Sequence, residues 1–130
     1  MPDSVTGPAE TAQAMDVVPG ALVQAQVFLL GDEPILLLVS ATHQVDTART
    51  GARLDGELAP APPHLAVKYT GQTPGSIAPV GHPANLPTWV DIALSGFGEL
   101  VAAGGHPGSV FRTSYPQLLR ITAGLSLEMD

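Results

Sequence analysis

The chain is 130 residues long, the size of a single domain, and 45% of its residues are hydrophobic, which excludes a disordered protein. Charged residues make up only 13%, and the 14 Gly and 13 Pro argue against a helical bundle and favour short strands, turns and short helices. Twelve carboxylates against five Lys and Arg give a net charge of −7, which excludes broad nucleic-acid binding and allows only a small, local contact.

Several segments and residue types are absent from the sequence. Without Cys there is no disulfide framework, no thiolate zinc site and no cysteine nucleophile. No apolar run approaches the roughly 18 residues of a transmembrane helix. The start of the chain, Met1–Ser4, has neither the basic nor the apolar region of a signal peptide. We therefore expect a cytoplasmic protein.

The first half of the chain predicts two strands flanked by helices. A short helix is expected over residues 8–15. Strands are expected over Ala21–Leu30 and Ile35–Ser40, and the Gly31–Pro34 stretch between them is typical of a hairpin connection. Because the second strand has no polar alternation, both of its faces should be covered. Another helix is predicted over Asp46–Leu54.

The second half predicts short elements separated by loops. Residues 57–63 are expected to be loop, residues 64–70 are ambiguous between strand and helix, and residues 71–87 are mostly loop. Further strands are predicted over Thr88–Ile92, Glu99–Ala103 and Ser109–Thr113. A capping-box pattern at Ser114 begins a last helix, which Gly124 ends.

These elements predict one single mixed α/β domain with a small barrel-like, mostly antiparallel sheet flanked by helices. The expected limits are a loose N-terminal segment at residues 1–10, the domain at 11–124 and a C-terminal tail at 125–130.

Familiar enzyme signatures are missing. The sequence has no Gly-x-Ser-x-Gly elbow and no Walker loop. The stretch Gly96–Val101 lacks the third glycine of a dinucleotide fingerprint and leads into a strand rather than a helix. The four His have no short metal-binding spacing. We therefore predict no cofactor and no metal.

Two Gly- and Pro-rich stretches are more informative. Residues 70–83 and 103–109 combine glycines, which let a ligand approach the backbone, with prolines that stiffen the loop. Each contains a Gly-His-Pro turn, at His82 and at His106, and a histidine in a rigid turn is a plausible site residue. Ordinary surface loops are the alternative. Asp91 lies in an apolar predicted strand, where it is either a site residue or a hydrogen-bonded structural carboxylate.

Taken in order, these segments resemble the YbaK-type aminoacyl-tRNA deacylases, which are related to the editing domain of bacterial prolyl-tRNA synthetases. The resemblance runs from about Thr11 to Gly124. The matching stretches are Thr11–Phe28, Leu36–Asp46, Tyr69–Gly71 through Gly75–Pro83, Val90–Leu94, Ala102–Phe111 and Tyr115–Ala123.

The resemblance implies hydrolysis of the ester that joins a wrong amino acid to the terminal adenosine of a tRNA. Free-standing members act in trans on small amino acids such as Ala, Cys or Ser. In the family a Gly-x-x-x-Pro loop supplies backbone amides, and this matches Gly75–Pro79 here. A histidine in the turn after a late strand matches His106. The vicinal ribose hydroxyl of the substrate can assist, so no Ser-His-Asp set is needed.

The implied catalytic residues are Gln24, Gly75 and His106. Further positions are expected to bind substrate or to support the site. They are Thr70, Gly71, Ser76, Ile77, Ala78, Pro79, Gly81, His82, Asp91, Gly104 and Gly105. The implied partner is the acceptor end of an aminoacyl-tRNA, with a homodimer or a synthetase as a further expected partner and no membrane.

The sequence departs from the family pattern at two places. Many members carry Lys where this chain has Gln24, and an amide can hydrogen-bond a carbonyl or a ribose but supplies no positive charge. The chain is also N-terminally short relative to the family, since a helix and a strand usually precede the equivalent of Thr11. Three hypotheses follow: a trans-acting deacylase, a catalytically silent relative that binds aminoacyl, nucleotide or protein ligands, and a deacylase of small-molecule esters.

Overall fold

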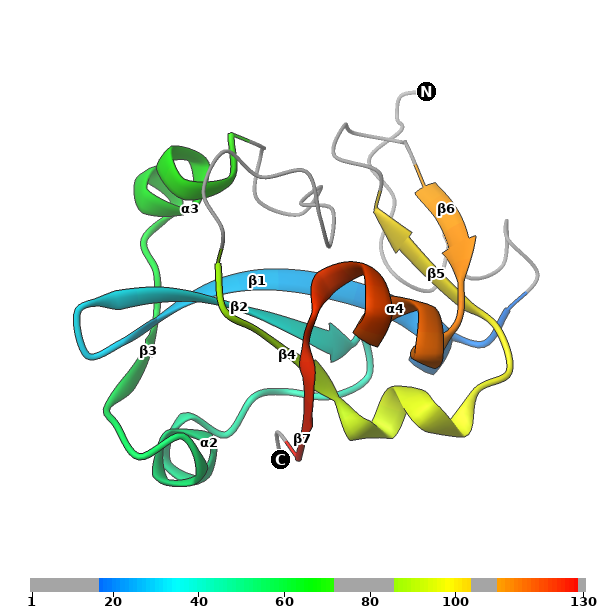
Figure 1. The fold of residues 1–130 in the computed structure, drawn as a ribbon, viewed down its shortest axis with the longest axis horizontal. Coiled ribbons are helices and arrows are strands. Elements are labelled where there is room, and N and C mark those ends of the chain that lie inside the picture. Colours follow the sequence, from blue (N-terminus) through cyan, green and yellow to red (C-terminus); the bar gives the residue numbers. More distant parts are fainter. Residues whose placement is uncertain (1–16, 72–85, 104–109, 129–130) are drawn as a thin grey trace.

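The computed structural model describes residues 17–71, 86–103 and 110–128. In this part of the chain helices lie between strands or strand pairs along the sequence, and the strands join in one sheet (Figure 1). The strands are β1 (Leu22–Leu30), β2 (Glu33–Ser40), β3 (Leu58–Pro60), β4 (Thr88–Asp91), β5 (Leu100–Ala103), β6 (Val110–Thr113) and β7 (Leu125–Leu127). The helices are α2 (Thr47–Arg53), α3 (Pro63–Thr70) and α4 (Tyr115–Thr122), with 3-10 turns η2 (Pro19–Ala21) and η3 (Ile92–Gly96).

The sheet is mixed and open. Its order is β6-β5-β1-β2-β4-β7, and β3 pairs with β1 beside this path. Pairings β1–β2, β1–β3 and β5–β6 are antiparallel, while β1–β5, β2–β4 and β4–β7 are parallel. The predicted single mixed α/β domain is confirmed. The described strands do not close into a barrel, and parallel pairings are as frequent as antiparallel ones, because β4, β5 and β7 return to the sheet after long connections.

The β1–β2 hairpin is the centre of the sheet and was predicted correctly. Gly31 takes a left-handed conformation, with φ of 63°, at the tight turn between the two strands. From Ile35 to Ser40 every residue of β2 is buried, as its unbroken apolar sequence predicted. Successive side chains of this strand point to opposite faces, so β2 contributes to two separate cores.

The larger core lies between one face of the sheet and helices α3 and α4. Its buried side chains come from both ends of the chain, including Val27, Leu36 and Leu38 of the hairpin, Ala66 of α3 and Leu118 of α4. The smaller core lies on the other face, under α2. It consists of Phe28, Ile35, Leu37, Val39 and Leu58, with Leu54 and Trp89 packed against it. Each fully buried Leu or Ile contributes roughly 1.5–3 kcal/mol to folding.

The predicted helices follow their capping signals. The Asp46 carboxylate accepts a hydrogen bond from the Arg49 N–H at 3.1 Å and begins α2. The Ser114 hydroxyl accepts from the Gln117 N–H at 3.4 Å and begins α4. That helix ends at Thr122, one residue before the left-handed Ala123, and Gly124 follows. The ambiguous stretch at 64–70 is helical.

Other parts of the sequence prediction differ from the structure or lie outside it. The stretch 57–63 was predicted to be loop, yet it contains β3, in which Pro60 stands opposite Phe28 at the end of a short edge strand where proline is tolerated. Residues 125–127, assigned to a tail, form β7 beside β4. The predicted helix at 8–15 lies outside the described residues.

Candidate functional site

The outer edge of β1 is incompletely paired, and the predicted site segments begin beside it. On this edge β5 pairs with Leu22 and Val23, and β3 pairs with Phe28, Leu29 and Leu30. Between these two pairings no described strand lies against residues 24–26. The same three residues are partly exposed, whereas their neighbours Val23 and Val27 are buried. Within the part of the chain that the structure describes, the central strand of the sheet therefore has a short edge, at residues 24–26, with which no other strand pairs; we call it the open edge.

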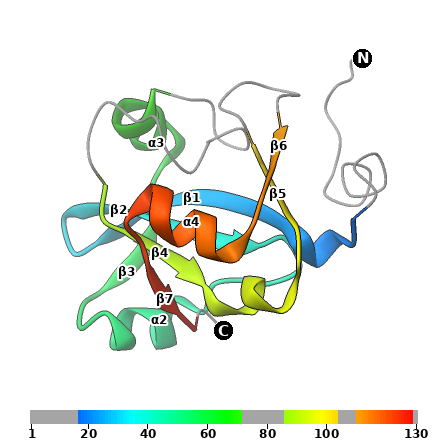
Figure 2. The same ribbon diagram turned by 45° about the vertical axis from the view of Figure 1, so that its right-hand side comes forward.

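Two elements stand at the two ends of this open edge. Helix α3 follows β3, and the β5–β6 hairpin lies at the opposite end, on the same side of β1 (Figures 1 and 2). Gly71, at the end of α3, is the last described residue before 72–85. Ala103 and Val110 pair at the end of the hairpin and flank residues 104–109. The chain therefore enters both predicted loop segments from elements that border the open edge.

Gln24 lies in this gap and keeps its backbone in the sheet. It stands opposite Val39 of β2, and its half-buried side chain is on the face of β1 that also carries Phe28. The side chain of Gln26 is the next one on that face, and its Nε2 donates a hydrogen bond of 3.5 Å to Gln24 Oε1. Because Gln24 accepts this bond through Oε1, both of its Nε2 hydrogens can donate to a ligand oxygen, without a positive charge.

Thr70 and Gly71 mark the end of α3. Thr70 is buried, and its hydroxyl donates to the Ala66 carbonyl at 2.7 Å, so this side chain holds the last helical turn. Gly71 has φ of 69° and its N–H donates to the Val67 carbonyl, which ends the helix in the left-handed conformation. Both residues thus set the direction in which the chain leaves α3 toward the predicted amide loop.

Most of the other predicted site residues lie outside the described part of the chain. These are Gly75, Ser76, Ile77, Ala78, Pro79, Gly81, His82, Gly104, Gly105 and His106. Their assignment stays a prediction.

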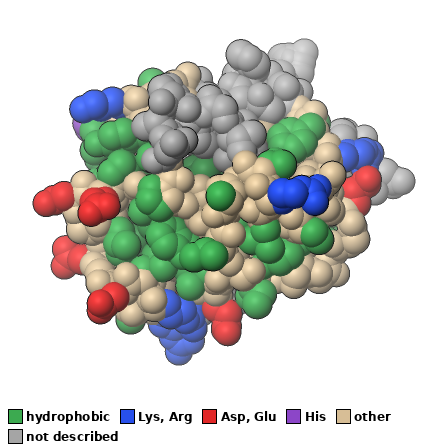
Figure 3. All heavy atoms as spheres, in the orientation of Figure 1, with side chains coloured by type: hydrophobic (Ala, Val, Ile, Leu, Met, Phe, Trp, Pro, Cys, Tyr) green, Lys and Arg blue, Asp and Glu red, His purple; other side chains and the backbone are tan. Residues whose placement is uncertain are grey.

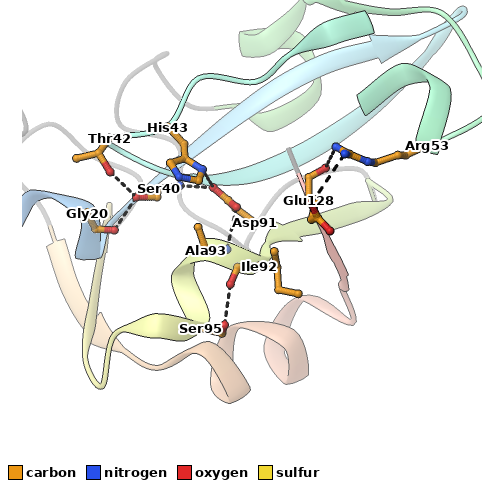
Figure 4. A network of polar contacts seen from close by, with 10 residues as sticks. All are labelled: Gly20, Ser40, Thr42, His43, Arg53, Asp91, Ile92, Ala93, Ser95 and Glu128. Atoms are coloured by element: carbon orange, nitrogen blue, oxygen red, sulfur yellow. Dashed lines mark hydrogen bonds and ion pairs between the residues drawn. The ribbon is translucent and has the colours of Figure 1, made fainter. Parts of the chain in front are cut away.

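Asp91 lies at the end of β4 and its carboxylate joins three segments (Figure 4). Oδ2 accepts a hydrogen bond from the Ser40 N–H at 3.2 Å and lies 3.2 Å from His43 Nδ1. Oδ1 accepts from the Ala93 N–H at 3.0 Å and caps η3. The side chain is only 1% exposed, so these partners satisfy a carboxylate that water does not reach. In the described structure Asp91 ties the ends of β2 and β4 together.

The polar network around Asp91 includes two residues that sequence reasoning did not select. Ser40 is buried, and its hydroxyl donates to the Gly20 carbonyl at 2.7 Å and lies 3.2 Å from Thr42 Oγ1. His43 has 29% of its side chain exposed and faces Asp91. The only available signal was position, since Ser40 is the last residue of the apolar strand β2 and His43 comes three residues after it. Among the described residues, no group of His, Asp and Glu is arranged to hold a metal ion.

Most of the positive charges are already paired. Arg49 lies near Asp46, Arg53 donates to the Glu128 carbonyl, and Arg112 donates to Glu99. On the face shown in Figure 3, blue side chains stand apart from each other and red ones lie between them, so this face has no broad basic surface. In the described ranges, no helix is long and apolar enough to cross a membrane.

The fold and the open edge define a small mixed α/β domain with a candidate site on its central strand. Comparison with known families identifies it further, since the aminoacyl-tRNA editing domain matches residues 3–121. The chain belongs to the family of aminoacyl-tRNA editing domains, as the resemblance to YbaK-type proteins predicted.

Sequence and structure comparisons with individual proteins support this family membership. A stretch of 74 residues is 39% identical to a proline–tRNA ligase from Levilactobacillus brevis, covering 56% of this chain and 13% of that much longer protein. A crystal structure described as a candidate trans-editing enzyme for prolyl-tRNA synthetase is 32% identical, with a TM-score of 0.90 over 95% of this chain and 78% of that one. A scaffold protein used in computational epitope grafting is 28% identical, with a TM-score of 0.92 over 97% and 81% of the two chains.

Proposed function

We propose that this protein is a trans-editing hydrolase that cleaves the ester of mischarged aminoacyl-tRNA carrying a small amino acid such as Ala, Cys or Ser. The observation that carries the proposal is the placement of Gln24 on the open edge of β1, between the elements that lead into the two predicted site loops. Membership of the editing-domain family supports the same reaction.

Each part of the proposed site has a chemical task in ester hydrolysis. Gln24 orients the terminal adenosine or the ester through its amide. The backbone N–H groups of the Gly75–Pro79 loop, to which Pro79 contributes none, hold the ester carbonyl, where negative charge develops in the transition state. His106 borders the pocket for the amino-acid side chain, and His82 and Asp91 support the site. The vicinal hydroxyl of the ribose helps to place the attacking water, so the protein needs to supply only position and hydrogen bonds.

The charge distribution supports recognition of the acceptor end alone. Affinity for a nucleic-acid backbone grows with the number of Lys and Arg side chains on its phosphates. Here the chain carries five such residues against twelve carboxylates, and Arg49, Arg53 and Arg112 are engaged with carboxylates or a carbonyl of the protein. A contact limited to the terminal nucleotide and its aminoacyl group fits this surface.

The test is deacylation of purified Ala-, Cys- and Ser-tRNA species by the full chain. We expect release of at least one amino acid above its spontaneous rate, and a Gln24→Ala variant should lower that rate. Gln44→Ala is the matched control, since Gln44 is an exposed amide side chain outside β1. Absence of deacylation of all three substrates would refute the proposal.

The same assay separates the rival hypotheses. A catalytically silent relative would be inactive and would gain activity on Gln24→Lys. A deacylase of small-molecule esters would hydrolyse free aminoacyl esters with no stimulation by tRNA.

A further inference from the structure

The backbone of β1 alternates between its two neighbours, and this alternation decides which residue faces the open edge. The Leu22 carbonyl accepts from Ala41, on the β2 side. The Val27 carbonyl accepts from Ala61, on the opposite side. In an extended strand the N–H and the C=O of one residue point to the same side, and those of the next residue point to the opposite side. Gln24 therefore hydrogen-bonds toward β2, and Ala25 directs both its N–H and its C=O into the open edge.

The open edge is too short for another strand. The distance along β1 from Val23 to Val27 is about 13 Å at the usual rise per residue. Both ends are already occupied, by β5 at Val23 and by Ala61 at Val27. An added peptide strand or a second copy of the chain would need several consecutive free residues. Among the described residues, no backbone group pairs with Ala25 on this side, so its N–H and C=O are placed to bind a ligand about one amino-acid residue long.

An aminoacyl ester matches this pair of groups. It carries a donor, the α-ammonium, and an acceptor, the ester carbonyl, on one amino-acid unit. Opposite residues in an antiparallel sheet exchange two hydrogen bonds, each giving its N–H to the other's C=O. An aminoacyl group in the gap can make the same exchange with Ala25.

We propose that Ala25 is a substrate-binding residue that acts through its backbone: its C=O accepts a hydrogen bond from the α-ammonium, and its N–H donates to the ester carbonyl. The aminoacyl group thereby takes the place of one residue of a neighbouring strand. This inference rests on the proposed function. It states how the proposed site recognises the α-amino group and the ester carbonyl of an aminoacyl ester, independently of the amino acid's side chain.

The N–H of Ala25 then also serves the reaction. The oxygen of water bonds to the carbonyl carbon, the bond from that carbon to the ribose oxygen breaks, and the ribose oxygen takes up the proton that water loses. In the tetrahedral intermediate between these two steps, the carbonyl oxygen carries negative charge, and a fixed backbone donor stabilises it. The products are the free amino acid and the uncharged tRNA.

The first experiment compares alanyl-tRNA with propionyl-tRNA, which differs only in lacking the α-amine. Loss of a hydrogen bond to a charged group is expected to lower kcat/KM about 10-fold to 100-fold after correction for the spontaneous rates. Equal kcat/KM values for the two substrates would overturn the proposal.

The second experiment removes the donor with Ala25→Pro. The missing N–H faces away from β2, so the hairpin keeps its ladder, and the rate on alanyl-tRNA should fall about 100-fold. Leu125→Pro is the control, because it places proline in the exposed edge strand β7, away from β1. We expect it to lower the melting temperature while the rate stays near that of the parent. A parental rate in Ala25→Pro would contradict the assignment.

A measurement that needs no turnover separates failure of this inference from failure of the proposed function. The full chain labelled with ¹⁵N is titrated with the amide analogue of alanyl-adenosine, which cannot be hydrolysed as an ester. The Ala25 amide proton should shift downfield and exchange more slowly with solvent in the complex. Binding that leaves the Ala25 amide unchanged, or no binding at millimolar concentration, would overturn the inference, even if the protein hydrolyses aminoacyl-tRNA.

Discussion

The Asp91 carboxylate should be one of the largest single contributors to the stability of the domain. It is 1% exposed and interacts with Ser40 N–H, Ala93 N–H and His43 Nδ1 at 3.0–3.2 Å. In Asp91→Ala the two backbone donors lose their acceptor, at about 1–3 kcal/mol each when buried and unpaired. Because the partly exposed His43 and the Ala93 N–H can recover water contacts, we expect a total loss of about 3–4 kcal/mol in the free energy of unfolding.

Urea unfolding followed by circular dichroism measures this loss. The midpoint should fall while the slope with urea stays that of the parent, because the surface exposed on unfolding does not change. Asp91→Asn keeps one acceptor oxygen and should lose about 1–2 kcal/mol. Asp32→Ala, in the exposed β1–β2 turn, is the control and should stay within about 0.5 kcal/mol of the parent. A loss below about 1 kcal/mol in Asp91→Ala would refute the view that this carboxylate joins β2 to β4.

Three further predictions concern stability. Gly51→Ala adds a Cβ that would lie 2.7 Å from the Gly56 carbonyl oxygen. It should therefore destabilise the protein by about 1–3 kcal/mol in urea unfolding, despite the better helix propensity of Ala. Gly98→Ala, which has open space around it, is the control and should be nearly neutral. Leu118→Ala empties a fully buried position of the larger core and should cost about 2–5 kcal/mol, read from the same curves; a cost under 1 kcal/mol would contradict the packing described. Gly31→Ala should lower stability by about 1–2 kcal/mol, because Gly31 has a positive φ that Ala adopts only with strain. Gly31→Asn should lower it by less, because Asn tolerates that conformation. Equal losses for the two variants would show a steric cause instead.

The elements that the sequence predicted well are those whose local signals agree with their surroundings. The apolar run of β2 required cover on both faces, and the two cores provide it. The Asp46 and Ser114 caps begin α2 and α4 as predicted. In contrast, β3 is held by pairing with β1 rather than by its own sequence, and its prolines pointed to a loop. Sheet order could not be predicted, because it depends on long-range pairing that no local pattern records.

For the candidate site, the sequence supplied residue types and the fold supplied their neighbours. Gln24 was selected by resemblance, and the structure adds that it borders an open edge. Asp91 was left open between a site residue and a structural carboxylate, and its three partners within the protein show a structural contribution. Ala25 carries no chemical signal in its side chain. Only strand register shows that its backbone faces the gap, and register is a property of the folded chain.

The pairing of β5 with β1 has a consequence for the order of folding. The β1–β2 hairpin joins residues that are close in the sequence, whereas Leu22 meets Val101 only after almost eighty further residues have been synthesised. Contacts between distant residues form late because closing a long loop costs more entropy than closing a short one. We therefore expect the hairpin to form early, with the outer edge of β1 unpaired at Leu22 and Val23 until the β5–β6 hairpin docks. The last large step of folding would then also define one end of the gap at Ala25.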